Sequence, residues 1–247
     1  MKLVTGHKAC PLPDLGPDVY AQWRASDIGA ITEQLQRRLI LFLLGDVNGR
    51  RVLDVGCGDG DLAIELRGRG AVVTGIDASP DMIKAAIARA KREGLEIEFA
   101  VGAAERIPFA PAQFDALVAI TILCFVAHAG PIFREIARLL RPGGLLVIGE
   151  LGKWSLWAAA RRIRAWSGSP LWRRGRFRTA RELRCLAGRA GLKAGPVHGA
   201  IYYPRWKRAA QILAAHDSAF GRATTLGAAF LALSAVKPVK RTRAEPK

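Results

Sequence analysis

The chain has 247 residues, half of them hydrophobic, and a formal net charge of +17 at pH 7. No uninterrupted apolar run approaches the roughly 20 residues of a membrane-spanning helix, and the N-terminus lacks an apolar stretch of the signal-peptide type, so we expect a cytoplasmic protein. Its cysteines, Cys10, Cys57, Cys124 and Cys185, are far apart, with no CxxC pair and no histidine at ligand spacing. This spacing argues against a zinc site and against a disulfide framework, and it predicts reduced thiols and no metal.

Helical spacing characterises the segment before residue 51. Five apolar side chains there fall on one face of a helix: Ile28, Ile31, Leu35, Leu39 and Phe42. We predict one or two N-terminal helices.

From residue 51 to residue 150, strand-like and helix-like segments alternate. The predicted strands are 51–55, 72–77, 96–101, 114–120 and 145–150, and the predicted helices are 61–68, 80–93 and 131–140. Strands separated by helix-length crossovers form a parallel sheet with helices on both faces. The predicted fold class is therefore α/β, a doubly wound, mostly parallel sheet.

The last two-fifths of the chain differ in composition. Residues 151–247 hold 21 Lys and Arg against 3 Asp and Glu, whereas residues 1–150 hold 17 against 18. Further helices are predicted over 179–190 and 206–216, and the apolar runs 194–203 and 226–236 predict a pair of C-terminal edge strands. We assign 151–238 to a basic, Trp-rich region that completes the sheet, and 239–247 to a disordered tail.

Three glycines, Gly56, Gly58 and Gly60, follow the first predicted strand with the spacing GxGxG. Such a turn lets backbone N–H groups and a helix N-terminus approach a ligand that any Cβ atom would block. Dinucleotide sites instead have the spacing GxGxxG. The carboxylate of Asp54, two residues before the first glycine, repels a pyrophosphate and attracts a cation. An NAD-dependent oxidoreductase is therefore disfavoured.

A second carboxylate, Asp77, ends the second predicted strand, 17 residues past Gly60. A carboxylate there can accept hydrogen bonds from both hydroxyls of a ribose. S-adenosylmethionine has a ribose but no phosphate, and its ammonium and sulfonium suit Asp54. We predict S-adenosylmethionine as the cofactor.

At this point the sequence resembles the class I S-adenosylmethionine-dependent methyltransferases, in particular the branch of quinone-biosynthesis and small-molecule methyltransferases. The matching motifs occur in the family's order over residues 51–150: "VLDVGCGDG", "VTGIDASPDMI", "GAAERIPF", "FDALVAI" and "LLRPGGLLVIGE". The resemblance implies a Rossmann-like methyltransferase fold, with 46–150 as the cofactor-binding α/β core and 1–45 as an N-terminal helical lid.

The resemblance also implies roles for individual residues. Asp54 and the loop of Gly56, Cys57, Gly58 and Gly60 hold the methionine part, and Asp77 holds the ribose. Other implied cofactor residues are Ala78 and Met82 beside the adenine, Ala104 and Glu105 over the adenine ring, and Ile120 and Thr121 at the pocket floor. The family commonly has an acid where this sequence has Ala103. The implied lid residues are Tyr20, Trp23 and Arg24.

The segment 153–178 carries four tryptophans and eight basic residues without an acid. On a helix from Ser155, the residues Leu156, Ala160 and Ile163 form one stripe. Interleaved Trp and Arg suit an anionic membrane surface, an acidic substrate or nucleic acid. The alternative is a helical cap with buried tryptophans and solvated arginines. Nucleic acid is disfavoured because no separate RNA-binding module is evident, whereas peripheral contact with the inner face of a membrane stays open.

Acceptor candidates are Trp154 and Trp157 in this segment, and Tyr202 and Tyr203 further on. His128, after the fourth strand, is either a general base or a solvent-facing loop histidine. We favour the second interpretation and assign no catalytic residue. The predicted function is methyl transfer from S-adenosylmethionine to a small, acidic or amphiphilic acceptor, phenol- or quinone-like or lipid-like. The alternative is a non-catalytic S-adenosylmethionine-binding or RNA-associated protein of the same fold.

Overall fold

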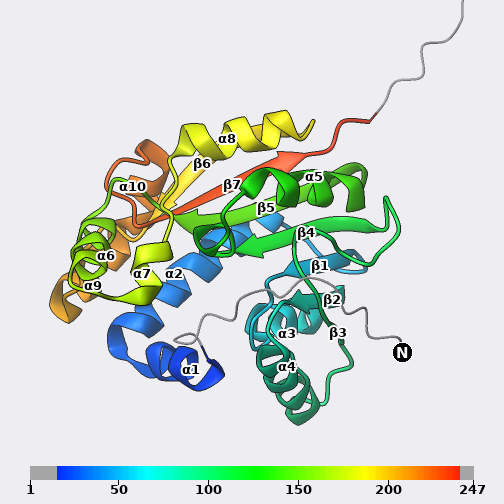
Figure 1. Ribbon diagram of the computed structural model, residues 1–247, viewed down its shortest axis with the longest axis horizontal. Helices are drawn as coiled ribbons and strands as arrows, with labels where there is room; N and C mark the ends of the chain where they lie inside the picture. The colour runs from blue at the N-terminus through cyan, green and yellow to red at the C-terminus, as the bar shows by residue number, and fades with distance from the viewer. Residues whose placement is uncertain (1–15, 240–247) are drawn as a thin grey trace, which may run out of the picture.

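A computed structural model describes residues 16–239 (Figure 1). Its centre is a seven-stranded sheet in the order β3-β2-β1-β4-β5-β7-β6. The strands are β1 (Arg51–Val55), β2 (Val72–Asp77), β3 (Glu98–Val101), β4 (Phe114–Ile120), β5 (Leu140–Leu151), β6 (Lys193–Ala200) and β7 (Phe230–Val236). The first five are parallel, whereas β7 is antiparallel to both of its neighbours. The predicted doubly wound, mostly parallel sheet is confirmed.

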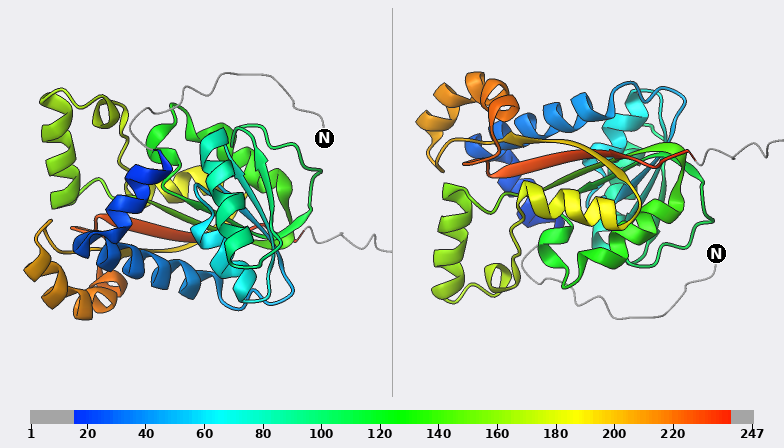
Figure 2. Two further views of the ribbon diagram at one scale, coloured as in Figure 1. Left: turned by 90° about the horizontal axis from the view of Figure 1, so that it is seen from below. Right: turned by 90° about the horizontal axis from the view of Figure 1, so that it is seen from above.

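Helices cover both faces of this sheet (Figure 2). The helices α5 (Ala129–Leu139) and α8 (Ala180–Arg189) pack on one face, and α2 (Asp27–Leu44), α3 (Asp61–Gly68) and α9 (Lys207–Leu213) pack on the other. The remaining elements are α1 (Pro17–Ala25), α4 (Pro80–Arg92), α6 (Leu156–Trp166), α7 (Pro170–Arg174), α10 (Asp217–Ala223), η1 (Leu123–Phe125) and η2 (Ala214–His216). The carboxyl ends of β4 and β5 point toward the end of the molecule where α6 and α9 lie (Figure 1).

Side-chain caps fix where several helices begin. Ser26, Ser79 and Ser155 each accept a hydrogen bond from the backbone N–H three residues on. Thr179 and Glu182 form a reciprocal capping box at the start of α8. The starts of α2, α4, α6 and α8 therefore follow from local sequence.

The predicted pair of C-terminal strands extends one edge of the sheet. Of the two, β7 lies between β5 and β6, so β6 is the outermost strand. The side chains of β7 from Phe230 to Ala235 are buried on both faces except Ser234, a pattern typical of an internal strand. Two details differ from the prediction: β5 already begins at Leu140, before the predicted turn, and the chain contains the helices α7 and α10, which were not predicted.

Phe42 was predicted to share the apolar face of α2, and this is wrong. The buried residues of α2 are Gly29, Thr32, Ile40 and Leu44, whereas the side chain of Phe42 is 70% exposed. Two residues from Ile40, Phe42 is rotated about 200° around the helix axis and faces solvent.

The three cysteines in the described part of the chain are unpaired, with Cys57 and Cys124 buried and Cys185 exposed. Cys10, the beginning of the predicted lid up to residue 15 and the predicted tail from residue 240 lie outside the described residues. Within residues 16–239, no group of His, Cys, Asp and Glu side chains has a metal-binding arrangement. No helix in the same range combines the length and apolarity needed to cross a bilayer.

We predict that Phe230→Ala lowers the free energy of unfolding by about 3 to 5 kcal/mol. The Phe230 ring is fully buried and packs on Gly149 of β5, where an added Cβ atom would lie 2.2 Å from the ring. Phe42→Ala removes the same side chain at an exposed site and should change stability by less than about 0.5 kcal/mol. Urea unfolding of both variants checks this, and equal losses would contradict the internal position of β7.

Candidate functional site

The predicted cofactor residues lie where the strand order of the sheet reverses. β1 pairs with β2 on one side and with β4 on the other, because the chain first builds outward to β3 and then crosses back. Ligands of open α/β sheets bind at the carboxyl ends of the strands beside such a reversal. Asp54 lies near the end of β1, and Asp77 ends β2. The fold therefore brings both carboxylates to the same edge.

The glycine loop has a backbone conformation that residues with side chains rarely adopt. Gly56, Gly58 and Gly60 all have positive φ angles, of 73°, 55° and 79°. An added Cβ atom at Gly56 would lie 2.1 Å from the Ile122 side chain, whereas the space beside Gly58 is open for 4 Å. This loop can thus lie directly against a ligand.

Asp77 is held beside this loop by two backbone donors. The N–H of Gly58 donates to Oδ2 at 3.0 Å, and the N–H of Ser79 donates to Oδ1 at 2.8 Å. Each carboxylate oxygen can accept a further hydrogen bond. The Asp77 carboxylate is therefore fixed in position and still able to accept from ligand hydroxyls.

Asp54 is buried, and its Oδ2 has no hydrogen-bond partner. Burial, together with the smaller effect of the Asp77 charge, raises the pKa of this carboxyl to about 7. A buried carboxylate oxygen without a partner is unfavourable unless a ligand supplies a donor or a positive charge. The glycine loop and the two carboxylates together fit S-adenosylmethionine.

The other predicted cofactor residues differ in how far they are exposed to solvent. Met82 is buried in the first turn of α4, Ala104 is half-buried, and Ala78 and Glu105 are exposed. Cys57 is buried, and burial raises the pKa of its thiol. Ile120 ends β4, and Thr121 follows with a positive φ of 54° and an N–H that donates to the Gly149 carbonyl at 2.7 Å. Their contacts with a ligand stay predictions.

Ion pairs connect the N-terminal helices to the glycine loop. Arg24 of α1 donates to both carboxylate oxygens of Asp59 in the loop, with Nη1 at 2.9 Å from Oδ1. Arg89 of α4 also binds Asp59, at 3.2 Å. Arg37 of α2 binds Asp61 and Glu65 of α3. The predicted lid segment therefore lies against the loop in the described residues.

Two other predicted residues of α1 face different neighbours. The Arg24 guanidinium lies 5.1 Å from the centroid of the Tyr20 ring, and burial raises the pKa of Tyr20 to about 12. The Trp23 ring meets the Trp157 ring edge-on, with centroids 6.0 Å apart. This contact joins the N-terminal helices to α6.

Two of the acceptor candidates belong to the core. Trp157 and Tyr203 are 2% and 1% exposed, and the Trp157 Nε1–H donates to the Tyr203 carbonyl at 2.7 Å. The Tyr202 hydroxyl donates to the Thr224 carbonyl. Trp154 is exposed, as is His128, which precedes α5 without capping it. The structure thus does not bring these candidates together around one cavity.

Glu150, which sequence reasoning did not single out, is fully buried near the end of β5. Its Oε1 accepts from the Leu123 N–H at 2.7 Å, and burial raises its pKa to about 8. This carboxyl therefore holds η1 beside the carboxyl end of β4. Asp59 was also missed, although both residues lie within motifs that match the family, because a motif does not show which partner a carboxylate binds.

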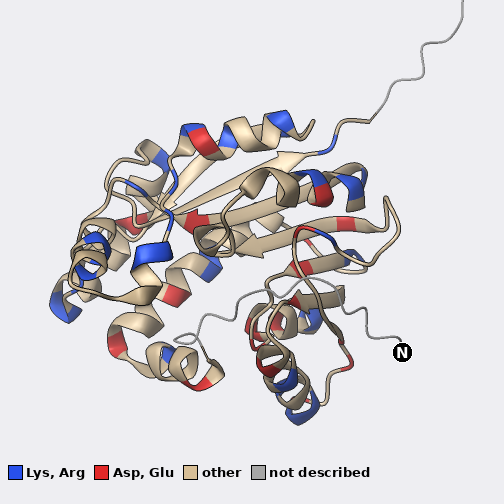
Figure 3. Cartoon of the chain, viewed as in Figure 1, with Lys and Arg blue, Asp and Glu red and all other residues tan. Residues whose placement is uncertain are grey.

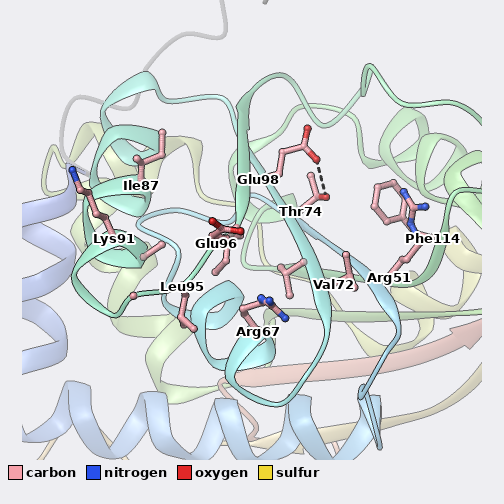
Figure 4. A pocket seen from close by; sticks show the side chains of 14 residues that line it. Arg51, Arg67, Val72, Thr74, Ile87, Lys91, Leu95, Glu96, Glu98 and Phe114 are labelled. Carbon is pink, nitrogen blue, oxygen red and sulfur yellow. Dashed lines mark hydrogen bonds between the residues drawn. The ribbon is translucent and has the colours of Figure 1, made fainter.

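A wide groove of about 720 Å³ lies elsewhere on the molecule (Figure 4). It begins at Arg51 and Val72, the first residues of β1 and β2, and also includes Thr74, Lys91 and Glu98. Arg51, Val72 and Glu98 are the first residues of β1, β2 and β3, so the groove lies at the amino ends of these strands, and no predicted cofactor residue lines it. It is separate from the cofactor site.

We predict that S-adenosylmethionine binds more tightly as the pH rises from about 6 to about 8, by up to about tenfold per pH unit below the Asp54 pKa. Positive charge on the ligand favours ionised Asp54, whose pKa is raised to about 7, so binding releases its proton. Calorimetry in buffers of different ionisation enthalpy measures that release. Asp54→Asn should remove this component, and identical pH profiles for both proteins would contradict the assignment.

Known proteins share this arrangement of motifs. Residues 53–148 match the family model described as a methyltransferase domain. The ubiquinone biosynthesis O-methyltransferase of Caulobacter sp. (strain K31) is 36% identical over 174 residues, which are 66% of this chain and 68% of that protein. An uncharacterized protein of Mycobacterium tuberculosis is 38% identical over 184 residues, 74% of this chain. The match spans only 59% of that mycobacterial protein's length.

Solved structures share the fold at low sequence identity. A methyltransferase from Thermotoga maritima, described as a possible histamine N-methyltransferase, has a TM-score of 0.68 at 19% identity, covering 89% of this chain and 95% of its own. The magnesium protoporphyrin IX methyltransferase of Synechocystis PCC 6803, solved with bound SAH, has a TM-score of 0.66 at 19% identity, covering 89% and 93%. Together with the sequence relatives, they show that the chain belongs to the class I S-adenosylmethionine-dependent methyltransferases.

Proposed function

We propose that this protein transfers the methyl group of S-adenosylmethionine to a small, acidic or amphiphilic acceptor, phenol- or quinone-like or lipid-like. The observation that carries the proposal is the unpartnered, buried Oδ2 of Asp54 beside the glycine loop and Asp77. The name of the Caulobacter relative, a ubiquinone biosynthesis O-methyltransferase, supports an acceptor of the phenol class.

The cofactor, when bound, supplies a methyl group activated by its sulfonium leaving group. Catalysis then depends on holding the acceptor atom in line with the methyl group and on excluding water. Asp54 would attract the cofactor's positive charge, and Asp77 would accept from its ribose hydroxyls. Glu150 positions η1, the segment that follows β4 on the acceptor side.

Several apolar side chains near α6 and α9 are exposed. The predicted stripe of α6 faces solvent, because the buried residues of that helix are Trp157 and Ala158. Seven side chains in this part of the chain are more than half exposed: Trp154, Leu156, Ile163, Trp166, Trp206, Ile212 and Leu226. The helices that carry most of them, α6 and α9, lie at the same end of the molecule (Figure 2).

Basic side chains accompany these apolar ones. Lys and Arg gather on α6, α7 and α9, with few acids among them (Figure 3). Exposed tryptophans among cations are typical of proteins that lie on anionic bilayers. We therefore propose peripheral membrane contact through this end, which would give access to an amphiphilic acceptor.

We predict that Asp77→Asn weakens S-adenosylmethionine binding at least about tenfold, because it removes the charge that strengthens hydrogen bonds from the ribose. Asp81→Asn is the matched control: this acid, in the first turn of α4, pairs only weakly with Lys84 at 3.4 Å, and both side chains are exposed. Isothermal calorimetry with the cofactor and with its demethylated product measures both variants. Equal affinities for Asp77→Asn and wild type would contradict the site.

We also predict that the protein co-sediments with vesicles of phosphatidylcholine and phosphatidylglycerol but not of phosphatidylcholine alone, and that about 0.5 M salt weakens the binding. Trp166→Ser and Trp206→Ser should each weaken it about tenfold, because each loses one apolar anchor. Phe42→Ser, exposed on α2, is the control and should bind like wild type. Failure to bind either vesicle would remove the membrane component of the proposal.

A further inference from the structure

The three arginines of α6 have different surroundings. Arg162 donates to the Lys153 carbonyl at 3.1 Å and lies over the Phe177 ring, and Arg164 is exposed. Arg161 is half-buried, and its Cζ lies 5.3 Å from the Trp157 ring centroid and 4.7 Å from that of Trp172. Two indole rings, one from α6 and one from α7, therefore hold the Arg161 guanidinium.

A second guanidinium approaches the same indole. The Cζ of Arg205, a surface residue before α9, lies 5.2 Å from the Trp157 ring centroid. Within residues 16–239, neither Arg161 nor Arg205 forms an ion pair with Asp or Glu. Burial, with smaller effects of the positive charges of Arg205 and Arg164, lowers the pKa of Arg161 to about 10. Arg161 and Arg205 therefore lie against one indole, near a third positive charge, without a carboxylate paired to either.

Trp157, the indole beside both arginines, contacts Trp23, whose neighbour Arg24 binds Asp59 of the glycine loop. The Arg161 charge acts on Cys124 of η1, whose thiol stays neutral because burial raises its pKa, and this thiol donates to the Thr121 carbonyl at 3.0 Å. Thr121 is a predicted residue of the cofactor-pocket floor. Glu150, the buried carboxyl of this region, accepts from the Leu123 N–H through Oε1, leaves Oε2 without a hydrogen-bond partner among residues 16–239 and forms no ion pair with either arginine. A ligand can therefore supply the negative charge that balances the two arginines.

We infer that Arg161 and Arg205 form a subsite for an oxyanion, such as a carboxylate, carried by a flat, unsaturated acceptor. Guanidinium groups bind oxyanions through paired N–H donors, and a group held against an aromatic ring is already oriented for that contact. The half-buried indole of Trp172 also gives an apolar surface beside the charge. This inference rests on the proposed function, because it assigns the acceptor's negative charge to named residues.

Two fluorescent probes with the same aromatic body separate charge from apolar contact. 8-Anilinonaphthalene-1-sulfonate carries an oxyanion, and N-phenyl-1-naphthylamine carries none. The full chain, saturated with the demethylated cofactor, is titrated with each probe. Arg161→Gln and Arg205→Gln should each raise the Kd of the sulfonate about tenfold, as expected for a lost charge-assisted hydrogen bond. The Kd of the neutral probe should stay within about twofold.

Arg184→Gln is the matched control, because it removes the same charge from an exposed arginine on α8, whereas Arg164 lies near enough to act on both Arg161 and Arg205. This control should leave both Kd values unchanged, and Arg161→Lys should retain part of the sulfonate affinity. An equal loss in Arg184→Gln would show general surface attraction and overturn the subsite. A parallel loss for the neutral probe would show apolar packing and also overturn it, as would unchanged sulfonate binding in both test variants.

The two hypotheses fail in different ways. Absence of cofactor binding in calorimetry would refute the proposed function, and the probe titration, repeated without cofactor, would still test the arginines. Circular dichroism checks the fold of each variant. If Arg161→Gln does not fold, the surface variant Arg205→Gln carries the test alone.

Discussion

Parallel pairing of β1 with both β2 and β4 places the Asp54 carboxylate in the middle of the sheet's carboxyl edge, where neighbouring strands exclude water. The backbone there has no donor left for Oδ2, because the strand N–H groups are used in the ladders. The glycine loop then turns away from β1 with a left-handed backbone, and Asp77 closes it from β2. The shape of the site thus follows from where one acidic side chain is buried.

Many helices and strands are determined by short stretches of sequence, and these elements could be predicted. The strands 51–55, 72–77 and 114–120 match the structure at both ends, because buried parallel strands have continuous apolar runs bounded by polar residues or glycine. The α8 capping box likewise marks that helix in the sequence. The place of β7 between β5 and β6 could not be predicted, since hydrophobic patterns show that a strand is buried but not which strands it joins.

The residues of the site also fall into two groups, those that local sequence predicts and those that it does not. Asp54, Asp77 and the glycines were found because their spacing places them at strand ends. The partnership of Arg24 with Asp59 joins residues 35 positions apart, and nothing in either local sequence indicates it. The sequence predicts Trp157 as an acceptor candidate, but Trp23, Tyr203 and two arginines surround it. Such contacts depend on three-dimensional packing, which composition does not reveal.

Trp23 and Arg24 are neighbours in α1, yet they contact opposite sides of the site. Arg24 binds the glycine loop through Asp59, and Trp23 packs on Trp157, the indole that also carries Arg161 and Arg205. A displacement of α1 that releases one contact therefore disturbs the other. If α1 acts as the proposed lid, exchange of the spent cofactor and admission of the next acceptor would share this gate, and a compulsory order of binding would follow in place of a random one.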